Sequence, residues 1–355
     1  MSEPIRVTRA TTKKPHPRDS ELGFGMVFTD HMFIMNYEDE KGWYDPRVES
    51  YGPFSLDPAT AVLHYGQGLF EGLKAFRGRD GKIRLFRPQK HVERMNTTAR
   101  RMCIPPLDAD LVLKSFTTLV DLDRGWVPST VGTSLYIRPT IIASEPFLGV
   151  RPAKRYLYFV ILSPVGAYYP EGMNPVKIKV IDEYVRAVPG GLGEAKTSAN
   201  YAASLYAAEE AKHEGFTQVL WLDGVHRTYI EEVGTMNIML RIGDEVITPP
   251  LHGTILAGVT RDSSLALMRE WGLEVSERQV SIDEVREAAH RGTLREVWGT
   301  GTAAVISPVG ELAYKGERIV VNQGRIGELT QRLYDAIVAI QYGTAPDTHR
   351  WTVEV

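Results

Sequence analysis

The chain has 355 residues, of which 43% are hydrophobic and 24% charged, a size and composition that favour a two-domain globular protein and exclude a disordered one. Basic and acidic residues nearly balance, 41 against 44, and no polybasic run occurs, so nucleic acid and anionic membranes are not expected as partners. Cys103 is the single cysteine, which excludes an intrachain disulfide and predicts a reducing, cytoplasmic location.

The first 24 residues predict an extended N-terminal arm. They are polar and proline-bearing, and they lack the apolar core of a signal peptide. No run in the chain reaches the roughly 18 apolar residues needed to span a bilayer. The nine histidines are scattered without an H-x-x-x-H pair, so no metal site is predicted.

Residues 25–165 predict a small α+β domain with an antiparallel sheet flanked by helices. Short aromatic and β-branched segments are separated by turn signals, and the Asp-Gly pair in "RDGK" predicts a hairpin because it readily adopts positive φ. In the helical segment that follows, the residues on one stripe are Val92, Met95, Ala99 and Met102. The predicted helices are 87–104 and 108–127, and the predicted strands after them are 133–144 and 155–165.

Residues 166–175 concentrate Gly, Pro and Asn and predict an interdomain linker. Residues 176–355 predict a larger second domain that mixes strands and helices. Its predicted strands lie in 176–184, 217–249 and 297–310, and its predicted helices in 200–216, 260–272, 281–292 and 327–343. Ser281 and Glu284 have the spacing of a capping box at the start of one of these helices.

The stretch "GGLGEAKTSANY" (190–201) places Lys196 among glycines and other small residues. A lysine acts as a carbonyl nucleophile only when its amine is partly unprotonated, which requires a desolvated or electrically tuned setting. Glycines let a flat cofactor approach the backbone, and Tyr201 brings a phenol close in sequence. A solvated loop with an incidental amine is the alternative.

The strand-like run "EEVGTMN" (231–237) carries two adjacent glutamates. Side chains alternate across a strand, so Glu231 and Glu232 point to opposite faces and one of them can be turned inward. A buried carboxylate needs a partner, and a pyridinium nitrogen is one such partner. Gly234 and Asn237 within the run favour a bulge at a site, whereas an edge strand with two surface glutamates is the alternative.

Two turns offer backbone amides to an anion. In "GVTRDSSLAL", Gly258, Val259 and Thr260 lie at the start of a helix whose first amides lack intrahelical partners. In "GTGTA" (299–303), free amides lie beside two threonine hydroxyls. Each can be a plain turn, but two threonine-bearing turns in one domain favour a phosphate site.

Two arginines lie where a partner is required. Arg94 is on a predicted helix, and Arg138 is in the apolar strand "LYIRP", where an unpaired guanidinium is costly. A salt bridge to a surface glutamate is the alternative for each. The sequence contains no Walker A, nucleophile-elbow or dinucleotide-binding glycine motif that would indicate another chemistry.

The lysine loop, the strand carboxylate and the two anion turns together resemble the branched-chain amino acid aminotransferases of the fold type IV, pyridoxal phosphate-dependent family. The resemblance runs from about residue 22 to 345, and the strings that carry it are "LHYGQGLFEGLKAFRG", "RLFRPQKHVERM", "LYIRPT", "AKTSANYAASL", "EEVGTMN", "AGVTRDS" and "GTGTAAVISPV". It implies an α/β (α+β) fold of two domains: a small N-terminal α+β domain and a larger C-terminal domain with a β-barrel-like sheet core flanked by helices.

The resemblance also implies the cofactor, pyridoxal 5′-phosphate, and the residues that hold it. Lys196 matches the catalytic lysine, which bonds to the cofactor and moves a proton. Tyr201 matches the phenol on the ring oxygen, and Glu232 rather than Glu231 matches the carboxylate at the pyridine nitrogen. The residues that match the phosphate ligands are Arg94, Val259, Thr260 and Thr302.

For the substrate, the resemblance implies that the amides of Thr302 and Ala303, with Tyr65, meet the carboxylate. The side-chain pocket and its rim match Phe70, Tyr136, Arg138 and Tyr168. Val150 matches a residue that reaches the neighbouring subunit's site, so a homodimer or a higher homo-oligomer is implied.

The implied reaction is reversible amino transfer between L-leucine, L-isoleucine or L-valine and 2-oxoglutarate, with ping-pong kinetics, in branched-chain amino acid biosynthesis. Aromatic walls accept a branched alkyl group, and Arg138 is the hypothesised partner of the distal carboxylate of glutamate. A D-amino-acid aminotransferase or an aminodeoxychorismate lyase is the alternative within fold type IV. A non-catalytic protein that binds a phosphate ligand is the alternative from another class.

Overall fold

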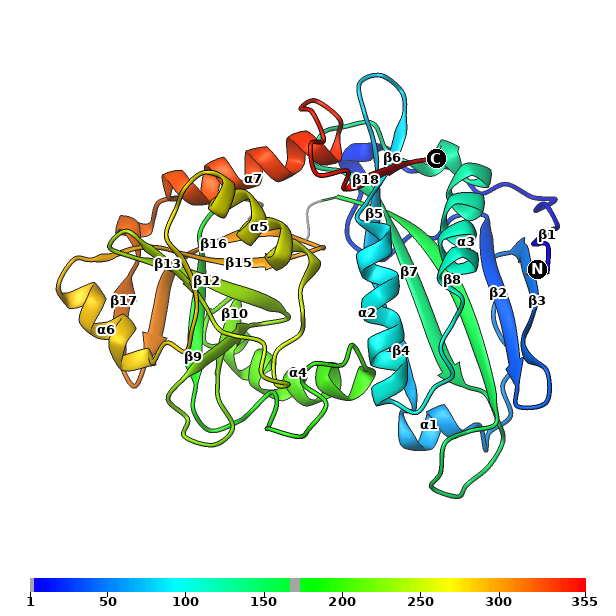
Figure 1. Ribbon diagram of the computed structural model, residues 1–355, viewed down its shortest axis with the longest axis horizontal. Helices are drawn as coiled ribbons and strands as arrows, with labels where there is room; N and C mark the ends of the chain where they lie inside the picture. The colour runs from blue at the N-terminus through cyan, green and yellow to red at the C-terminus, as the bar shows by residue number, and fades with distance from the viewer. Residues whose placement is uncertain (1–2, 167–172) are drawn as a thin grey trace. The chain divides into compact units, whose positions relative to one another are not determined.

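The structure is a computed structural model that describes residues 3–166 and 173–355 (Figure 1). The chain forms two units: Met1–Tyr168, Ala195–Ser198 and Ala339–Val355 make up the first, and Tyr169–Glu194 and Ala199–Val338 the second. The lysine segment and the C-terminal segment thus belong to the first unit, whereas the sequence-based limits include both in the second domain. Those limits stay a prediction, and the predicted linker lies largely outside the described residues.

The described part of the first unit contains one nine-stranded sheet, in the order β1-β3-β2-β8-β7-β5-β6-β18, with β4 paired to β7. Its strands are β1 (Arg6–Val7), β2 (His31–Glu38), β3 (Gly42–Ser50), β4 (Gly68–Phe70), β5 (Leu73–Arg77), β6 (Ile83–Phe86), β7 (Ser134–Ala143), β8 (Arg155–Val165) and β18 (Thr352–Glu354). Except for the parallel pair β1–β3, these strands pair antiparallel, and the β5–β6 hairpin turns at the predicted Asp-Gly pair.

Helices α2 (Pro88–Arg101) and α3 (Ala109–Leu122) lie along one face of this sheet (Figure 1). The predicted stripe faces the core, because Val92, Met95 and Ala99 are buried among residues of the sheet. Asp108 caps α3 by accepting a hydrogen bond from the Leu111 amide at 2.8 Å. The unit also contains α1 (Ala61–Tyr65), η1 (Asp19–Glu21) and η2 (Arg124–Trp126).

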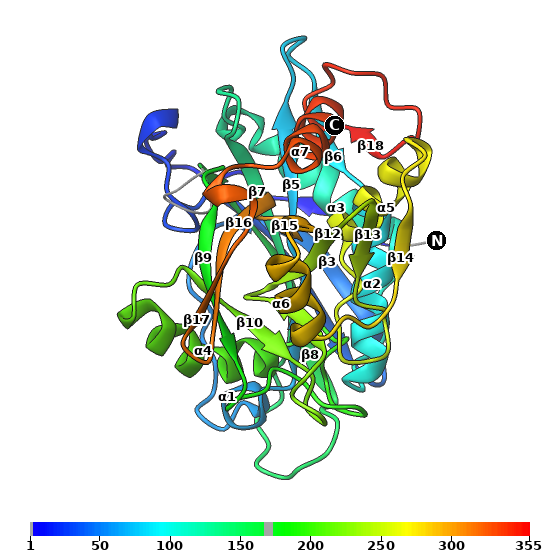
Figure 2. The same cartoon turned by 90° about the vertical axis from the view of Figure 1, so that its left-hand side faces the viewer.

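The second unit is built on a closed six-strand barrel (Figure 2). Among its described residues the strand order is β11-β10-β9-β16-β15-β12-β13-β14, and a further β11–β12 pairing closes the ring. Its strands are β9 (Val176–Ile181), β10 (Gln218–Leu222), β11 (Ile230–Val233), β12 (Met236–Ile242), β13 (Glu245–Thr248), β14 (Val275–Glu277), β15 (Leu294–Gly301), β16 (Val305–Tyr314) and β17 (Glu317–Val320). The barrel-like core implied by the resemblance is therefore present.

Helices α5 (Val259–Glu270) and α6 (Ile282–His290) both contact β15. The predicted cap of α6 forms, since Ser281 accepts a hydrogen bond from the Glu284 amide at 2.9 Å. The remaining helical elements are α4 (Ser198–His213), η3 (Asn322–Gly324) and α7 (Glu328–Gln341). None of the helices in the described ranges is long and apolar enough to cross a membrane.

The run around "EEVGTMN" folds differently from the expectation of a bulge at Gly234 or Asn237. Gly234 lies in a tight turn between β11 and β12, with a φ of +57°, a conformation that favours glycine. Glu232 pairs with Asn237, and Val233 pairs with Met236, across this hairpin. Gly234 reverses the chain instead of interrupting one strand. The irregularity within this run lies at Glu231, where the pairing of β10 with β11 shifts register, so the expected bulge is present but not at Gly234 or Asn237.

Candidate active site

The main chain of Lys196 is anchored between a helix and a strand of the first unit. Its amide donates a hydrogen bond to Thr98 Oγ1 on α2 at 3.1 Å, and its carbonyl accepts one from the Phe70 amide on β4 at 3.1 Å. The next residue, Thr197, donates from its hydroxyl to the Gly68 carbonyl at 2.8 Å. None of these bonds uses the lysine side chain, so the backbone is held in place independently of the amine.

The Lys196 side chain is half-buried beside aromatic rings. Its Nζ lies 5.0 Å from the centroid of the Phe70 ring, and the Arg138 guanidinium lies 4.8 Å from the same centroid. Arg138 Nη2 donates to Tyr136 Oη at 3.3 Å. A Cβ at Gly72 would lie 1.8 Å from that phenol oxygen, so only glycine leaves room for the Tyr136 ring.

A buried carboxylate holds Arg94. Glu71 is 1% exposed and accepts from Arg94 Nε at 2.7 Å and Nη2 at 2.9 Å, while His91 Nδ1 lies 2.9 Å from its Oε2. Burial alone would raise the pKa of Glu71, but the Arg94 charge and the hydrogen bonds from Arg94 and His91 hold this pKa well below its usual range. Burial lowers the pKa of His91, and the carboxylate offsets only part of that shift.

We refer to these first-unit residues as the Lys196 cluster: Lys196, Phe70, Glu71, His91, Arg94, Tyr136 and Arg138. It brings together five residues that the sequence singled out. The other two are Glu71, which follows Phe70 in the chain and pairs with Arg94, and His91, on which the charge of Lys196 acts.

Glu232 is the inward-facing carboxylate of the second unit. It is 2% exposed, and its Oε2 lies 2.8 Å from Arg186 Nε. Its Oε1 accepts from the Leu256 amide at 3.0 Å and from Asn237 Nδ2 at 3.2 Å. Arg186 supplies the positive charge that a buried carboxylate requires, and the other two donors orient the group.

Arg186 also ties the start of the lysine loop to the segment before α5. Its Nη2 donates to the Gly193 carbonyl at 3.2 Å, and its Nη1 donates to the Thr254 carbonyl at 2.9 Å. A Cβ at Gly193 would lie 2.2 Å from that Thr254 oxygen. This glycine is therefore required by a close backbone approach within the second unit.

Strand register places Glu232, Asn237 and Thr300 side by side across β11, β12 and β15. Directly opposed residues on neighbouring antiparallel strands share a face, so these three form what we call the Glu232 row. Thr300 Oγ1 is buried and has no hydrogen-bond partner among the described residues. The turn that follows β15 contains Thr302 and Ala303, both half-buried.

Helix α5 begins next to this row. Its N-cap, Gly258, has a φ of −68° and has no side chain with which to cap the first amides. Val259 and Thr260 form the first turn and are buried. A Cβ at Gly258 would lie 1.9 Å from Asn237 Oδ1, so the glycine allows the helix start to approach the row closely.

The family pattern described as amino-transferase class IV matches residues 68–312 of the chain. The chain is also 55% identical over 351 residues to branched-chain-amino-acid aminotransferase 2 of Bacillus subtilis (strain 168), covering 99% of this chain and 97% of the relative. The chain belongs to the branched-chain amino acid aminotransferases of class IV.

Solved structures of the same family share the fold. The crystal structure of the branched-chain amino acid aminotransferase of Escherichia coli is similar with a TM-score of 0.77 and 26% identity, covering 91% of this chain and 98% of the other. The branched-chain amino acid aminotransferase of Thermobaculum terrenum, solved in its PLP-form, shares the fold with a TM-score of 0.76 at 20% identity, covering 92% and 98%. The predicted family and fold are confirmed.

The other predicted site residues of this class IV aminotransferase are Tyr65, Val150, Tyr201 and Tyr168. Tyr65 ends α1, and its hydroxyl donates to the Leu148 carbonyl. Val150 follows in the same loop and is 87% exposed. Tyr201 is half-buried in the first turns of α4, in the second unit. Tyr168 lies outside the described residues.

Sequence reasoning missed Glu71, His91, Thr98 and Arg186 as residues that position the site. A signal existed for His91, because it lies three residues before Arg94 on a helix and such residues share one side. Arg186 had no local signal. It lies in the irregular segment after β9, far along the chain from Glu232.

Proposed function

We propose that this chain catalyses reversible amino transfer between L-leucine, L-isoleucine or L-valine and 2-oxoglutarate. The cofactor is pyridoxal 5′-phosphate, and the enzyme works in the cytoplasm, in branched-chain amino acid biosynthesis. Family membership supports the reaction, since a relative named for it is 55% identical over nearly the whole chain. When bound, the cofactor supplies an aldehyde that takes up the amino group and a ring that accepts electrons.

The residues present fit this cofactor. Thr300 offers a buried hydroxyl without a partner among the described residues, in the same row as the Glu232 carboxylate. Helix α5 starts beside that row with no side-chain cap in the described part of the chain, which suits a phosphate group. An acidic group for a ring nitrogen and a helix start for a phosphate therefore lie in one unit.

Each residue then has a defined task. Lys196 would hold the cofactor covalently and carry the proton that leaves or joins the substrate Cα at its Nζ. Glu232 would accept a hydrogen bond from the ring nitrogen, and Tyr201 would donate one to the ring oxygen. The residues proposed to bind the phosphate are Arg94, Val259, Thr260 and Thr302. Arg186 acts through Glu232 as a positioning residue, because it pairs with the carboxylate at 2.8 Å.

The substrate would be bound by backbone amides and by side chains. The amides of Thr302 and Ala303 would meet its carboxylate. Phe70 and Tyr136 would line the side-chain pocket, and Arg138, whose guanidinium lies against both rings, would meet the distal carboxylate of glutamate. Tyr65 and Tyr168 complete the proposed set.

A homodimer is part of the proposal. Leu148 and Val150 are 62% and 87% exposed in one loop of the first unit, and Phe147 in the same loop is also exposed. Apolar side chains gathered in this way on a surface mark a protein interface. A neighbouring copy of the chain would cover them, and Val150 would reach its site.

Substitution of Lys196 tests the proposal most directly, because the two hydrogen bonds of its main chain do not depend on the side chain. Lys196→Ala should therefore fold normally and lose at least about 10³-fold in turnover of L-leucine with 2-oxoglutarate. Lys212→Ala, at an exposed position of α4, is the matched control and should retain wild-type turnover.

Borohydride should attach the cofactor to Lys196 in the wild type, as located by peptide mass spectrometry. Retention of full turnover in Lys196→Ala would refute the assigned mechanism. Preference for D-alanine over L-leucine in the same coupled assay would instead indicate a D-amino-acid aminotransferase.

A further inference from the structure

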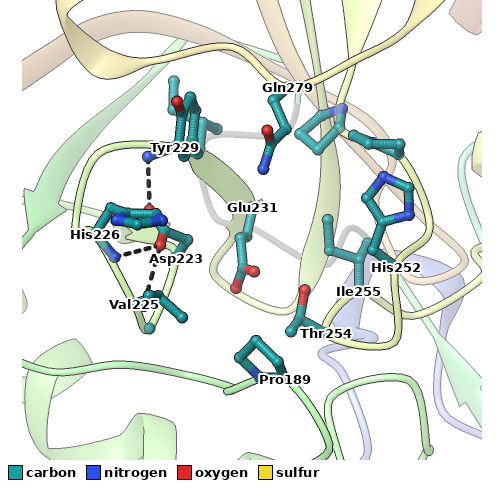
Figure 3. Close-up of a pocket in the computed structure, with 14 residues that line it drawn as sticks. Pro189, Asp223, Val225, His226, Tyr229, Glu231, His252, Thr254, Ile255 and Gln279 are labelled. Carbon is teal, nitrogen blue, oxygen red and sulfur yellow. Dashed lines mark hydrogen bonds between the residues drawn. The ribbon is translucent and has the colours of Figure 1, made fainter.

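A cavity opens in the second unit beside strand β11. Its volume is about 230 Å³, several times the ~30 Å³ that one water molecule occupies in the liquid. Figure 3 shows the residues around it, which come from the loop after β9, the turn after β10, β11, the segment before α5 and the segment after β14. They include Pro189, Asp223, Glu231, His252, Thr254 and Gln279.

Glu231 points into this cavity, between Thr254 and Gln279 in Figure 3. The residue is 6% exposed, and its Oε2 has no hydrogen-bond partner within residues 3–166 and 173–355. Thr254 lies beside the carboxyl group, and burial raises the pKa of Glu231. A buried acceptor without a donor is destabilising, and a ligand that supplies the donor removes that cost.

The other polar groups of the cavity indicate the charge of that ligand. The Asp223 carboxylate is already occupied, since it accepts from four amides of the turn, at 2.6 to 3.0 Å. The described lining residues include these two carboxylates and neither lysine nor arginine. Pro189, Val225 and Ile255 add apolar walls. The cavity therefore suits a positive charge at one end of a ligand and aliphatic carbon at the other.

We propose that this cavity is a second ligand site, in which Glu231 binds the cationic N–H group of a small aliphatic guanidinium or ammonium compound. The site is distinct from the Glu232 row, because Glu231 is among the residues that line the cavity, whereas Glu232, Asn237 and Thr300 are not. Thr254 lies next to both sites: it lines the cavity beside Glu231, and its carbonyl accepts from Arg186, the partner of Glu232.

Binding of propylguanidinium chloride to the cofactor-loaded enzyme tests the site, measured by isothermal titration calorimetry. A guanidinium avoids the reaction of a primary amine with the cofactor aldehyde. Propylurea has nearly the same shape without the charge and is the matched ligand. Propylguanidinium should bind saturably to the wild type, and propylurea at least about 10-fold more weakly.

Glu231→Gln keeps the size of the side chain and removes its charge, so affinity for propylguanidinium should fall at least about 10-fold. Glu274→Gln, at an exposed position of the same unit, is the matched control and should bind like the wild type. A crystal of the enzyme with propylguanidinium should show it against Glu231.

Three results would overturn the site: no saturable binding, equal affinity of the urea and the guanidinium, or equal affinity of Glu231→Gln and the wild type. If Glu231→Gln does not fold, the two ligands on the wild type and the position found in the crystal still decide. The readout is binding, so it is independent of the outcome of the leucine assay.

Discussion

The Lys196 cluster and the Glu232 row hold their functional groups by different means. In the Lys196 cluster, side chains position side chains: Glu71 holds Arg94 with two hydrogen bonds and contacts His91. In the Glu232 row, strand register sets the positions, and main-chain groups supply many of the contacts. Replacement of one side chain should therefore disturb more neighbouring side chains in the Lys196 cluster than in the Glu232 row.

Glu71→Gln should have the largest effect on stability. It leaves Arg94, whose side chain is only 10% exposed, without its carboxylate, which should lower the free energy of unfolding of the first unit by about 3–5 kcal/mol. Urea unfolding followed by circular dichroism measures the loss. Glu93 lies on α2, the helix of Arg94, and its ion pair with Lys90 is exposed. Glu93→Gln should therefore lower the free energy of unfolding by no more than about 0.5 kcal/mol. Equal losses in both variants would contradict the difference in mechanism.

Glu232→Gln should act on catalysis and also on stability, because it leaves Arg186, whose side chain is only 8% exposed, without its carboxylate. It keeps an oxygen for the Leu256 amide but removes the negative charge that the proposed ring contact needs, so kcat for L-leucine should fall about 10²–10³-fold. Stopped-flow spectra of the cofactor separate this effect from weaker cofactor binding. Glu274→Gln, at an exposed position, is the control. A kcat within about threefold of the wild type would remove Glu232 from the chemistry.

Arg138→Met should separate the two substrates. Methionine keeps an unbranched chain against Phe70 and Tyr136 but offers no donor, and a hydrogen bond to a charged group contributes about 1.5–3 kcal/mol. The KM for 2-oxoglutarate should rise roughly 10- to 100-fold, while that for L-leucine changes less than about threefold. The two half-reactions, measured separately, provide the test, and an equal loss for both substrates argues against the assignment.

Acid should weaken the Lys196 cluster by a smaller, graded amount. The pKa values of Glu71 and His91 are both lowered in the folded chain, from ordinary values of 4.5 and 6.5, so the unfolded chain binds more protons as the pH falls. The stability that His91 contributes is present above pH 6.5 and is lost below it, and that of Glu71 is present above pH 4.5 and is lost as the pH falls further.

Urea midpoints between about pH 8 and pH 3 measure this loss. Below pH 4.5 the slope with pH should be shallower in Glu71→Gln, since that variant lacks the carboxylate that titrates there. An identical slope in the variant and the wild type would mean that the carboxylate does not govern the acid response.

Local patterns in the sequence predicted most of the elements. The stripe of Val92, Met95 and Ala99 is buried as expected, and Ser281 caps its helix. The interpretation of "EEVGTMN" as a single strand with a bulge at Gly234 was wrong about the position, because Gly234 can either bulge a strand or reverse it and the sequence pattern suits both. Gly234 reverses the chain, and the register shift lies at Glu231. The pairing of β12 with β11 and β15 determines that Gly234 reverses the chain.

The sequence by itself determined that Glu231 and Glu232 face opposite sides and that Lys196 lies in a loop of small residues, since both follow from local periodicity and side-chain size. Only the tertiary structure showed that Arg186 is the partner of Glu232 and Glu71 the partner of Arg94. A buried carboxylate needs a cation or hydrogen-bond donors, but which group it meets depends on strand register and helix packing between residues far apart in the chain. Gly193 in the lysine loop is a further example. A glycine is required there because the Thr254 carbonyl oxygen lies 2.2 Å from the position that a Cβ would occupy.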